Sequence, residues 1–461
     1  MTTASQASWS PAPARPLWAR PPGVLVLVLV AMSSVLLMSP GSLLCLPGPL
    51  QHLPKAIEVL AVGYVGYELA RGRMQLSWSL PLTLGMLYVL HAVVSGLWAP
   101  FQQSFLEQIV KLVHALLLAP LLCLACRRVA DLTTCIVVFK ACSFVCALVA
   151  IAQRTLPFLQ IDALAEGNTM GDAMGMGLMY SEELSSGSIV RASGTLGHSN
   201  ALSLFLAGSM FFQPWLWLRF PFKRQRGLLL VITGCEGLAM LFTYGRLGMI
   251  AMVAAGAWML MRGGVRRPWF ALAIAFATFS ISLPFLPATW VERVLDPSHF
   301  AKSDSITGRW ELQVYGWQVV QKHGLFGGGY GQFGQLFYIE SQGYLKETVE
   351  YLVGHTEKHV DIDDLGAHDV YLEVVAEQGV LGLLLFVGTG ITMLLRLVQL
   401  SRRTMPRTSE RLLCITLECV VIAFGTASIF VHTQEMKVMW IALGLVCAWL
   451  RVGWGVVEAR T

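Results

Sequence analysis

A histidine at the end of a long polar segment has the chemistry of a general base. His368 begins the run HDVYLE (368–373), and Glu377 follows in the same predicted helix. Near neutral pH an imidazole can accept the proton of an attacking hydroxyl group. The alternative is an interfacial histidine whose hydrogen bonds are satisfied locally. We predict that His368 is catalytic, because the arginines described next could hold a leaving group beside it.

Three arginines have the chemistry to bind an anion. Arg191 lies in a Gly/Ser-rich approach to an apolar run, Arg246 lies in a very short turn between two apolar runs, and Arg309 begins a predicted surface helix. Guanidinium groups form paired hydrogen bonds with phosphate oxygens. Arg246 could instead reach lipid head groups, and Arg309 could be an ordinary solvated residue. We predict that all three bind a diphosphate leaving group.

The surrounding sequence predicts an all-α, polytopic membrane protein. Of its 461 residues, 55% are hydrophobic and only 13% are charged. Its apolar runs of about 20 residues are long enough to cross the hydrocarbon core of a bilayer as helices. We predict about 12 transmembrane helices, at residues 23–39, 55–70, 79–98, 106–126, 132–153, 196–218, 227–244, 247–262, 269–286, 368–395, 411–431 and 436–452.

The distribution of basic residues predicts the orientation of these helices. Arg and Lys collect in short cytoplasmic loops, and here their clusters fall on one side of all the predicted crossings. The first apolar run has the basic lead of a signal peptide, but no cleavage site stands out and we expect it to be retained. The predicted regions are a cytoplasmic tail (1–22), helices one to nine (23–286) with an outer loop near 154–195, a large outer loop (287–367), helices ten to twelve (368–455) and a second cytoplasmic tail (456–461).

The sequence favours chemistry without a metal ion or cofactor. The run HTEKHVDIDD (355–364) contains two histidines, but its glutamate is not placed as in the HExxH motif of zinc proteases. The ten cysteines lie almost entirely in apolar segments and are expected to pack there. The run GLFGGGYG (324–331) either cradles a phosphate with backbone amides or forms a tight loop, and it lacks the ending of a P-loop.

Three motifs in this order resemble the O-antigen ligase and polymerase family of bacterial inner membranes. The first is YGRLG (244–248) in a short turn. The second is GRW (308–310) followed by the Gly-rich GGGYGQF (327–333). The third is HDVYL (368–372) followed by EQGVLG (377–382), and the resemblance covers about residues 225–390. The sequence departs from the common family pattern at Gly245, where many members have Ser, and at Asp369, where Asn is common.

The resemblance implies a GT-C-like glycosyltransferase of lipopolysaccharide biosynthesis in the Gram-negative inner membrane. An O-antigen ligase moves the O-antigen polysaccharide from undecaprenyl pyrophosphate to the lipid A core oligosaccharide at the periplasmic face. The transfer would invert the anomeric configuration and need no metal ion. His368 would then be the base, and three arginines would hold the diphosphate: Arg191, Arg246 and Arg309. The candidates to line the cavity are His198, Tyr330 and Glu377.

Two other functions remain open on sequence grounds. An O-antigen polymerase joins lipid-linked repeats and tends to have two sizeable periplasmic loops, and the predicted loop at 154–195 would be the second. A lipid or glycan transporter would also suit twelve spans with both termini inside. Transporters usually show an internal repeat and broken helices near the membrane midplane. The absence of a convincing repeat in this sequence favours the ligase.

Overall fold

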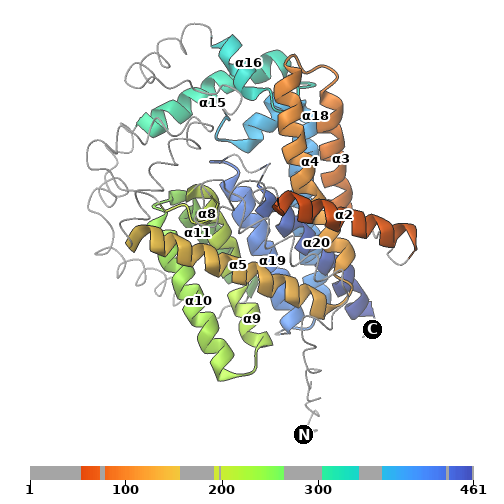
Figure 1. The fold of residues 1–461 in the computed structure, drawn as a ribbon, viewed down its shortest axis with the longest axis vertical. Coiled ribbons are helices and arrows are strands. Elements are labelled where there is room, and N and C mark those ends of the chain that lie inside the picture. Colours follow the sequence, from red (N-terminus) through yellow and green to blue (C-terminus); the bar gives the residue numbers. More distant parts are fainter. Residues whose placement is uncertain are drawn as a thin grey trace.

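The computed structural model describes residues 53–72, 78–155, 192–196, 199–263, 304–341, 366–406, 408–431, 434 and 436–458, and every regular element in these ranges is a helix (Figure 1). The all-α prediction is therefore confirmed. The helices are α2 (Leu53–Ala70), α3 (Leu80–Ser95), α4 (Gln102–Ala125), α5 (Val129–Thr155), α8 (Ser199–Met210), α9 (Gln213–Arg219), α10 (Lys223–Phe242), α11 (Arg246–Gly263), α15 (Asp304–His323), α16 (Phe333–Glu340), α18 (Val370–Arg403), α19 (Ser409–Ala427) and α20 (Lys437–Glu458).

The described helices also bear out the prediction of a polytopic membrane protein. Six segments are long and apolar enough to cross a bilayer: Gln102–Ala125, Val129–Thr155, Ser199–Arg219, Lys223–Phe242, Val370–Arg403 and Lys437–Gly455. Shorter apolar helices occupy Val59–Ala70, Leu80–Ser95 and Leu247–Gly263. The predicted spans at 23–39 and 269–286 lie outside the described residues, so the total number of crossings remains a prediction.

The main hydrophobic core lies between helices that are distant in sequence. Helix α20 packs against α4, α11 packs against α19, and α18 contacts both α3 and α19. The side chains of Trp440 and Trp449 on α20 are almost completely buried in this core. A smaller apolar cluster joins α15 and α16 to the first turns of α18, at one end of the molecule (Figure 1).

Helix α18 is interrupted at Gly379, where φ is 69° and ψ is −171°. The break frees backbone carbonyl groups, and residues 324–331, here called the Gly-rich loop, supply donors for them. The N–H groups of Gly328 and Gly329 donate to the carbonyl oxygens of Ala376 and Glu377 at 2.9 and 2.8 Å. A Cβ atom on Gly379 would lie only 2.3 Å from the carbonyl oxygen of Leu325, so this approach requires glycine.

The backbone amides of the Gly-rich loop are thus used within the protein. The N–H of Gly327 donates to the carbonyl oxygen of His323 at 2.7 Å, and the N–H of Tyr330 donates to Ser95 Oγ at 2.9 Å. Trp98 Nε1 donates to the Gly327 carbonyl at 3.1 Å. These contacts favour the tight-loop interpretation of the sequence run over a phosphate cradle.

Among the described helices, two ion pairs with a buried carboxylate connect helices that are distant in sequence. Lys140 on α5 pairs with Glu236 on α10, which also accepts hydrogen bonds from the hydroxyl groups of Ser143 and Ser209. At a second position, Glu418 on α19 accepts two hydrogen bonds from the guanidinium of Arg262 on α11, at 2.9 and 3.1 Å, and one from Trp258 Nε1 at 2.8 Å. Pairing and hydrogen bonding are what make buried charges tolerable in lipid.

Candidate functional site

His368 stands in a left-handed backbone conformation directly before α18. Its φ is 52°, a value that side chains with a Cβ atom rarely adopt, and the residue is half-buried. Asp369 follows as the N-cap, and its Oδ1 accepts the N–H groups of Tyr371 and Leu372 at 2.9 and 3.3 Å. The N–H of Val370 donates to the carbonyl oxygen of Ser428 at 2.9 Å. His368 therefore lies where the start of α18 meets the end of α19.

The carboxyl group of Asp369 has a shifted pKa. Burial raises this pKa above its ordinary value, the hydrogen bonds from the backbone of Leu372 and Tyr371 lower it, and the nearby charge of Glu373 raises it again. The net direction is upward, because desolvation of the carboxylate is the largest effect. Asp369 thus caps α18 with an acceptor that is less strongly ionised than an exposed aspartate.

A buried polar network lies behind the start of α18. Glu373, only 2% exposed, accepts the N–H of Ala367 at 3.2 Å with Oε2 and the side-chain amide of Gln434 at 2.8 Å with Oε1. Gln434 Oε1 accepts the Tyr88 hydroxyl at 2.6 Å, and Gln378 Nε2 donates to the same hydroxyl oxygen at 2.9 Å. The network joins α3, α18 and the segment between α19 and α20.

The segment that follows Arg191 lies beside the turn that carries Arg246. The N–H of Ala192 donates to the carbonyl oxygen of Phe242, the last residue of α10, at 3.1 Å. Gln153 Oε1 accepts the N–H groups of Ser193 and Gly194 at 3.2 and 2.9 Å, which fixes this segment on α5. Arg246 begins α11 four residues after Phe242. The backbone therefore brings the segment that follows Arg191 next to the turn that leads to Arg246.

The orientation of α11 places Arg246 at the same end of the bundle as His368. Arg262, at the far end of α11, donates to Ser401 Oγ near the C-terminal end of α18 at 2.6 Å. The beginning of α11 consequently points toward the opposite end of α18, where His368 lies. Arg309 belongs to α15, whose Gly316 lies close to Leu372, since a Cβ there would be 3.0 Å from Leu372 Cδ2.

Not every predicted site residue can be located. Arg191 and His198 lie outside the described residues, as do His355 and His359 in the acidic run. Arg246 and Arg309 are placed by their helices, while the structure does not describe their side chains. Their contact with a diphosphate therefore remains a prediction.

Residues 227–387 match the family described as O-antigen ligase. This range contains Arg246, Arg309, the Gly-rich loop and the first half of α18 with His368 and Glu377. The resemblance found in the sequence motifs is thereby confirmed over this part of the chain. A comparison with curated proteins finds no match to the chain.

Two predicted cavity residues, Glu377 on α18 and Tyr330 in the Gly-rich loop, help to fix the segment 329–333 against α18 and α3. Glu377 is 2% exposed and its Oε1 accepts the N–H of Phe333 at 3.1 Å. Tyr330 is completely buried beside Ser95. The helical rise separates Glu377 from His368 by roughly 13 Å along α18. The described contacts of both residues are structural, and their place in a substrate cavity stays a prediction.

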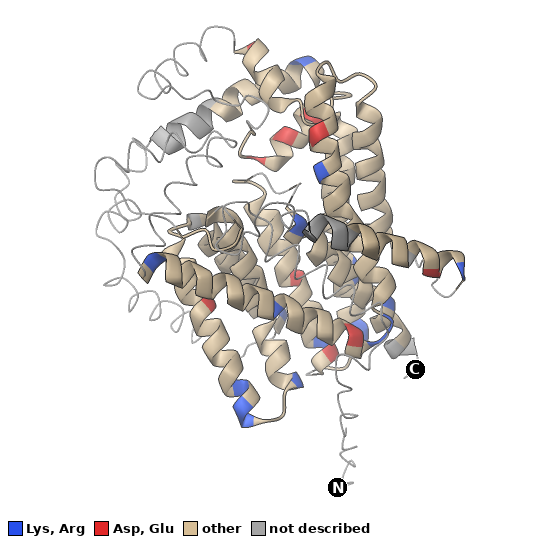
Figure 2. Cartoon of the chain, in the orientation of Figure 1, with Lys and Arg blue, Asp and Glu red and all other residues tan. Residues whose placement is uncertain are grey.

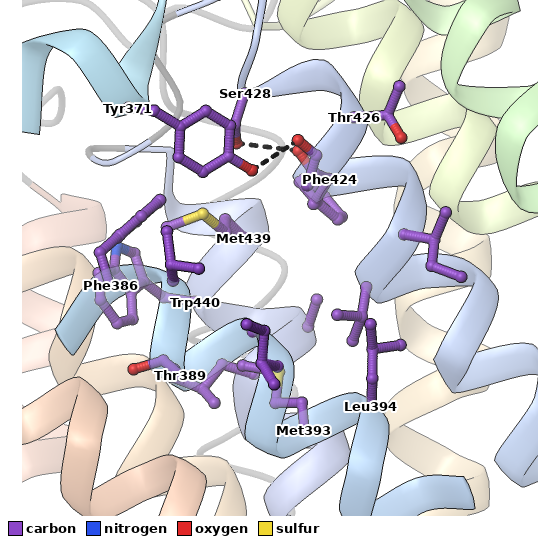
Figure 3. Close-up of a pocket in the computed structure, with 18 of the residues that line it drawn as sticks. Tyr371, Phe386, Thr389, Met393, Leu394, Phe424, Thr426, Ser428, Met439 and Trp440 are labelled. Carbon is purple, nitrogen blue, oxygen red and sulfur yellow. Dashed lines mark hydrogen bonds between the residues drawn. The ribbon is translucent and has the colours of Figure 1, made fainter. Parts of the chain in front are cut away.

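An apolar pocket of about 320 Å³ adjoins the start of α18 (Figure 3). Helices α18, α19 and α20, together with Tyr88 on α3, line it, largely with aliphatic and aromatic side chains. At one end, the Tyr371 hydroxyl donates to the Gly425 carbonyl at 2.8 Å, and Ser428 Oγ donates to the Phe424 carbonyl at 2.9 Å. Those two residues adjoin the His368 segment, so the pocket suits a hydrocarbon chain attached to a polar group at that end.

Sequence reasoning missed Tyr88 and Gln434. Tyr88 lies within an apolar run and Gln434 directly after one, and 346 positions separate them. A pattern of local hydrophobicity carries no signal for such a contact. In the parts of the chain that the structure covers, no group of three or more His, Cys, Asp or Glu could hold a metal ion. The cysteines in these parts are free, and all except the half-buried Cys235 are buried.

Proposed function

We propose that this protein is an O-antigen ligase that transfers O-antigen from undecaprenyl pyrophosphate to the lipid A core at the periplasmic face of the inner membrane. The observation that carries the proposal is the position of His368. It directly precedes α18 within the residues that match the O-antigen ligase family, at the end of the bundle where α11 and α15 bring Arg246 and Arg309. An apolar pocket adjoins the same helix start.

The proposed reaction is a single displacement at the anomeric carbon. His368 accepts the proton of the acceptor hydroxyl, and the hydroxyl oxygen forms a bond with the anomeric carbon. The bond from that carbon to the diphosphate oxygen breaks, and the electron pair leaves with undecaprenyl pyrophosphate. Attack opposite to the leaving group inverts the anomeric configuration. The proton on the imidazole is then released to water.

The developing charge on the leaving group requires cationic partners. Arg191, Arg246 and Arg309 have guanidinium groups that can each bind two phosphate oxygens. Two observations support their cooperation: Ala192 is hydrogen-bonded to the end of α10 that leads to Arg246, and α15 packs across the first turns of α18. In this arrangement the diphosphate sits between the α10–α11 turn and α15.

The apolar pocket supports a donor that carries a hydrocarbon chain. Its polar end, at Tyr371 and Ser428, adjoins the segment of the proposed base, and its walls belong to α18 to α20. The arrangement lets the isoprenoid chain remain among membrane helices while the diphosphate and sugar reach His368. A lipid-linked donor therefore fits the chemistry of both parts of the site.

The experiment that tests the function is reconstitution with defined substrates. Purified protein in liposomes, given lipid-linked O-antigen and lipopolysaccharide that lacks O-antigen, should produce complete lipopolysaccharide without ATP and in the presence of EDTA. Longer lipid-linked glycan as the sole product would identify a polymerase. Movement of the donor across the bilayer without a new glycosidic bond would identify a transporter, and either result would refute the ligase assignment.

Variants of the arginines test the proposed donor site. Arg246→Lys retains the positive charge and loses the paired geometry, so we expect KM for the lipid-linked donor to rise by about tenfold, with a smaller change in kcat. Arg226→Lys is the matched control. Arg226 Nε donates to the carbonyl group of Trp217 in α9 and to that of Phe220, directly after α9. Normal donor use by Arg246→Lys and Arg246→Ala would assign Arg246 to lipid head groups.

A further inference from the structure

The backbone of His368 needs external support. The left-handed region raises the free energy of a residue with a Cβ atom by about 1–2 kcal/mol. His368 therefore keeps its φ of 52° only because the residues on both sides of it are fixed. On the C-terminal side, the N–H of Val370 is held by the carbonyl oxygen of Ser428. On the N-terminal side, the N–H of Ala367 is held by a side chain, Glu373 Oε2.

Glu373 is placed to make that second contact with little freedom. It lies in the first turn of α18, where the helix dipole favours a negative charge, and its own N–H donates to the carbonyl oxygen of Asp369 at 3.0 Å. Its other carboxylate oxygen receives the Gln434 amide. Gln434 is itself held by Tyr88 through its side chain and by Trp440 Nε1, which donates to its backbone carbonyl at 2.7 Å.

We propose that Glu373 is a positioning residue for the transfer reaction: its buried carboxylate fixes the backbone at Ala367 and thereby aims the His368 imidazole at the acceptor hydroxyl. This inference rests on the proposed function, in which His368 is the base. Tyr88 and Gln434 complete the chain of contacts from α3 to the reacting end of α18. Small displacements of a base are costly to a reaction that depends on near-attack geometry.

The network permits a reciprocal exchange of its two polar side chains. In Glu373→Gln, the new amide group faces a donor, either the Gln434 amide or the Ala367 N–H. In Gln434→Glu, two carboxylates face each other across the present 2.8 Å contact. The double variant restores all three hydrogen bonds. The side-chain amide at position 373 donates to the carboxylate at position 434, which still accepts the Tyr88 hydroxyl. The amide oxygen at position 373 accepts the N–H of Ala367.

The exchange gives a test in the reconstituted full-length protein. We expect Glu373→Gln to lower kcat by about 10-fold to 100-fold while KM for the donor changes by less than about threefold. Gln434→Glu should show the same pattern, and the double variant should recover kcat to within about threefold of wild type. Glu340→Gln is the control, because it removes a half-buried carboxylate that pairs with the exposed Lys322 and should leave kcat unchanged.

Hydrogen exchange supplies a readout that does not depend on activity. The Ala367 amide should exchange faster in Glu373→Gln and return to the wild-type rate in the double variant. A Glu373→Gln protein that is folded and retains full kcat would overturn the inference, as would a folded double variant no more active than the single ones. Absence of transfer by the wild type would instead refute the proposed function, and exchange at Ala367 would still decide whether Glu373 holds this segment.

Discussion

At the scale of single residues, His368 combines a reactive side chain with an unfavourable backbone. Its left-handed φ is retained by hydrogen bonds on both sides, from Ala367 to Glu373 and from Val370 to Ser428. Strain of this kind persists where the surrounding structure determines the conformation, and it is common at functional sites. Mutation of His368 can therefore separate the cost of this backbone conformation to stability from its proposed benefit to catalysis.

The first prediction compares two substitutions at this position. Both His368→Ala and His368→Gly should abolish most transfer, because neither can accept a proton. Glycine adopts a left-handed φ without a steric penalty, so His368→Gly should be more stable than His368→Ala by about 1 kcal/mol. Thermal unfolding in detergent measures the difference. Equal stability of the two variants would show that the backbone at 368 is not strained, and full activity in either would remove the histidine from the mechanism.

The second prediction concerns the pH dependence contributed by Asp369. Its pKa is raised in the folded protein, so ionisation is less favourable there than in the unfolded chain, and its contribution to stability falls as pH rises through this range. Asp369→Asn keeps an oxygen acceptor for Tyr371 and Leu372 and cannot ionise. The variant should therefore gain stability over wild type at neutral pH, and the gain should vanish below the ordinary pKa of 3.8. A gain that is independent of pH would contradict this account.

The sequence singled out the residues that are proposed to carry chemistry, but it did not indicate which contacts hold them. His368 and the three arginines could be singled out by residue type, position beside apolar runs, and family motifs. Glu373 could be seen as a carboxylate near the histidine, but its contact with Gln434 depends on the folding of segments 61 residues apart. Long-range polar networks follow from tertiary packing, which local periodicity does not encode.

At the scale of elements, the interruption of α18 organises the domain. The sequence pattern predicted a single span from residue 368 to 395, and the structure has two helical pieces that meet at Gly379. The carbonyl groups freed at the break accept hydrogen bonds from backbone N–H groups of the Gly-rich loop. The glycine density was visible in the sequence, but its partner on α18 was not, because a positive φ at one glycine inside an apolar run leaves no compositional signature.

The third prediction tests this break with two glycines of the same helix. Gly379→Ala should destabilise the protein by more than about 2 kcal/mol, because the new Cβ meets the backbone of Leu325 and φ is positive. Gly388→Ala is the control, since a Cβ there lies 3.7 Å from Leu84 Cδ1 in ordinary contact, and it should be neutral or slightly stabilising. Thermal unfolding and protease cleavage near residues 324–331 report the outcome. Similar stability of both variants would contradict the tight docking.

At the scale of the whole molecule, charge separates the two ends of the bundle. Figure 2 shows Lys and Arg residues gathered around the connection between α9 and α10 and near the C-terminal end, whereas Lys322, in the last turn of α15, pairs with Glu340 on α16. This distribution agrees with the positive-inside rule if α15 and α16 face the periplasm. It supports the proposed orientation, in which both termini lie in the cytoplasm.

The fourth prediction tests that orientation by labelling in spheroplasts. In a cysteine-free background, Tyr338→Cys on α16 should react with a membrane-impermeant maleimide from outside, because Tyr338 is 46% exposed. Lys223→Cys, at the start of α10, should react only after the membrane is permeabilised. The opposite pattern would invert the topology and would place the proposed site on the cytoplasmic face.

The pair of Lys140 and Glu236 bears on how the protein is made. These residues are 96 positions apart, so α5 leaves the ribosome with an unneutralised lysine well before α10 follows with the matching carboxylate. At ordinary translation rates the interval is about 5–20 s. An unpaired charge in a membrane helix is expensive, so we expect α5 to enter its final position in the bilayer only when α10 is present. On this account, the buried ion pair of Lys140 and Glu236 makes the insertion of α5 depend on the synthesis of α10.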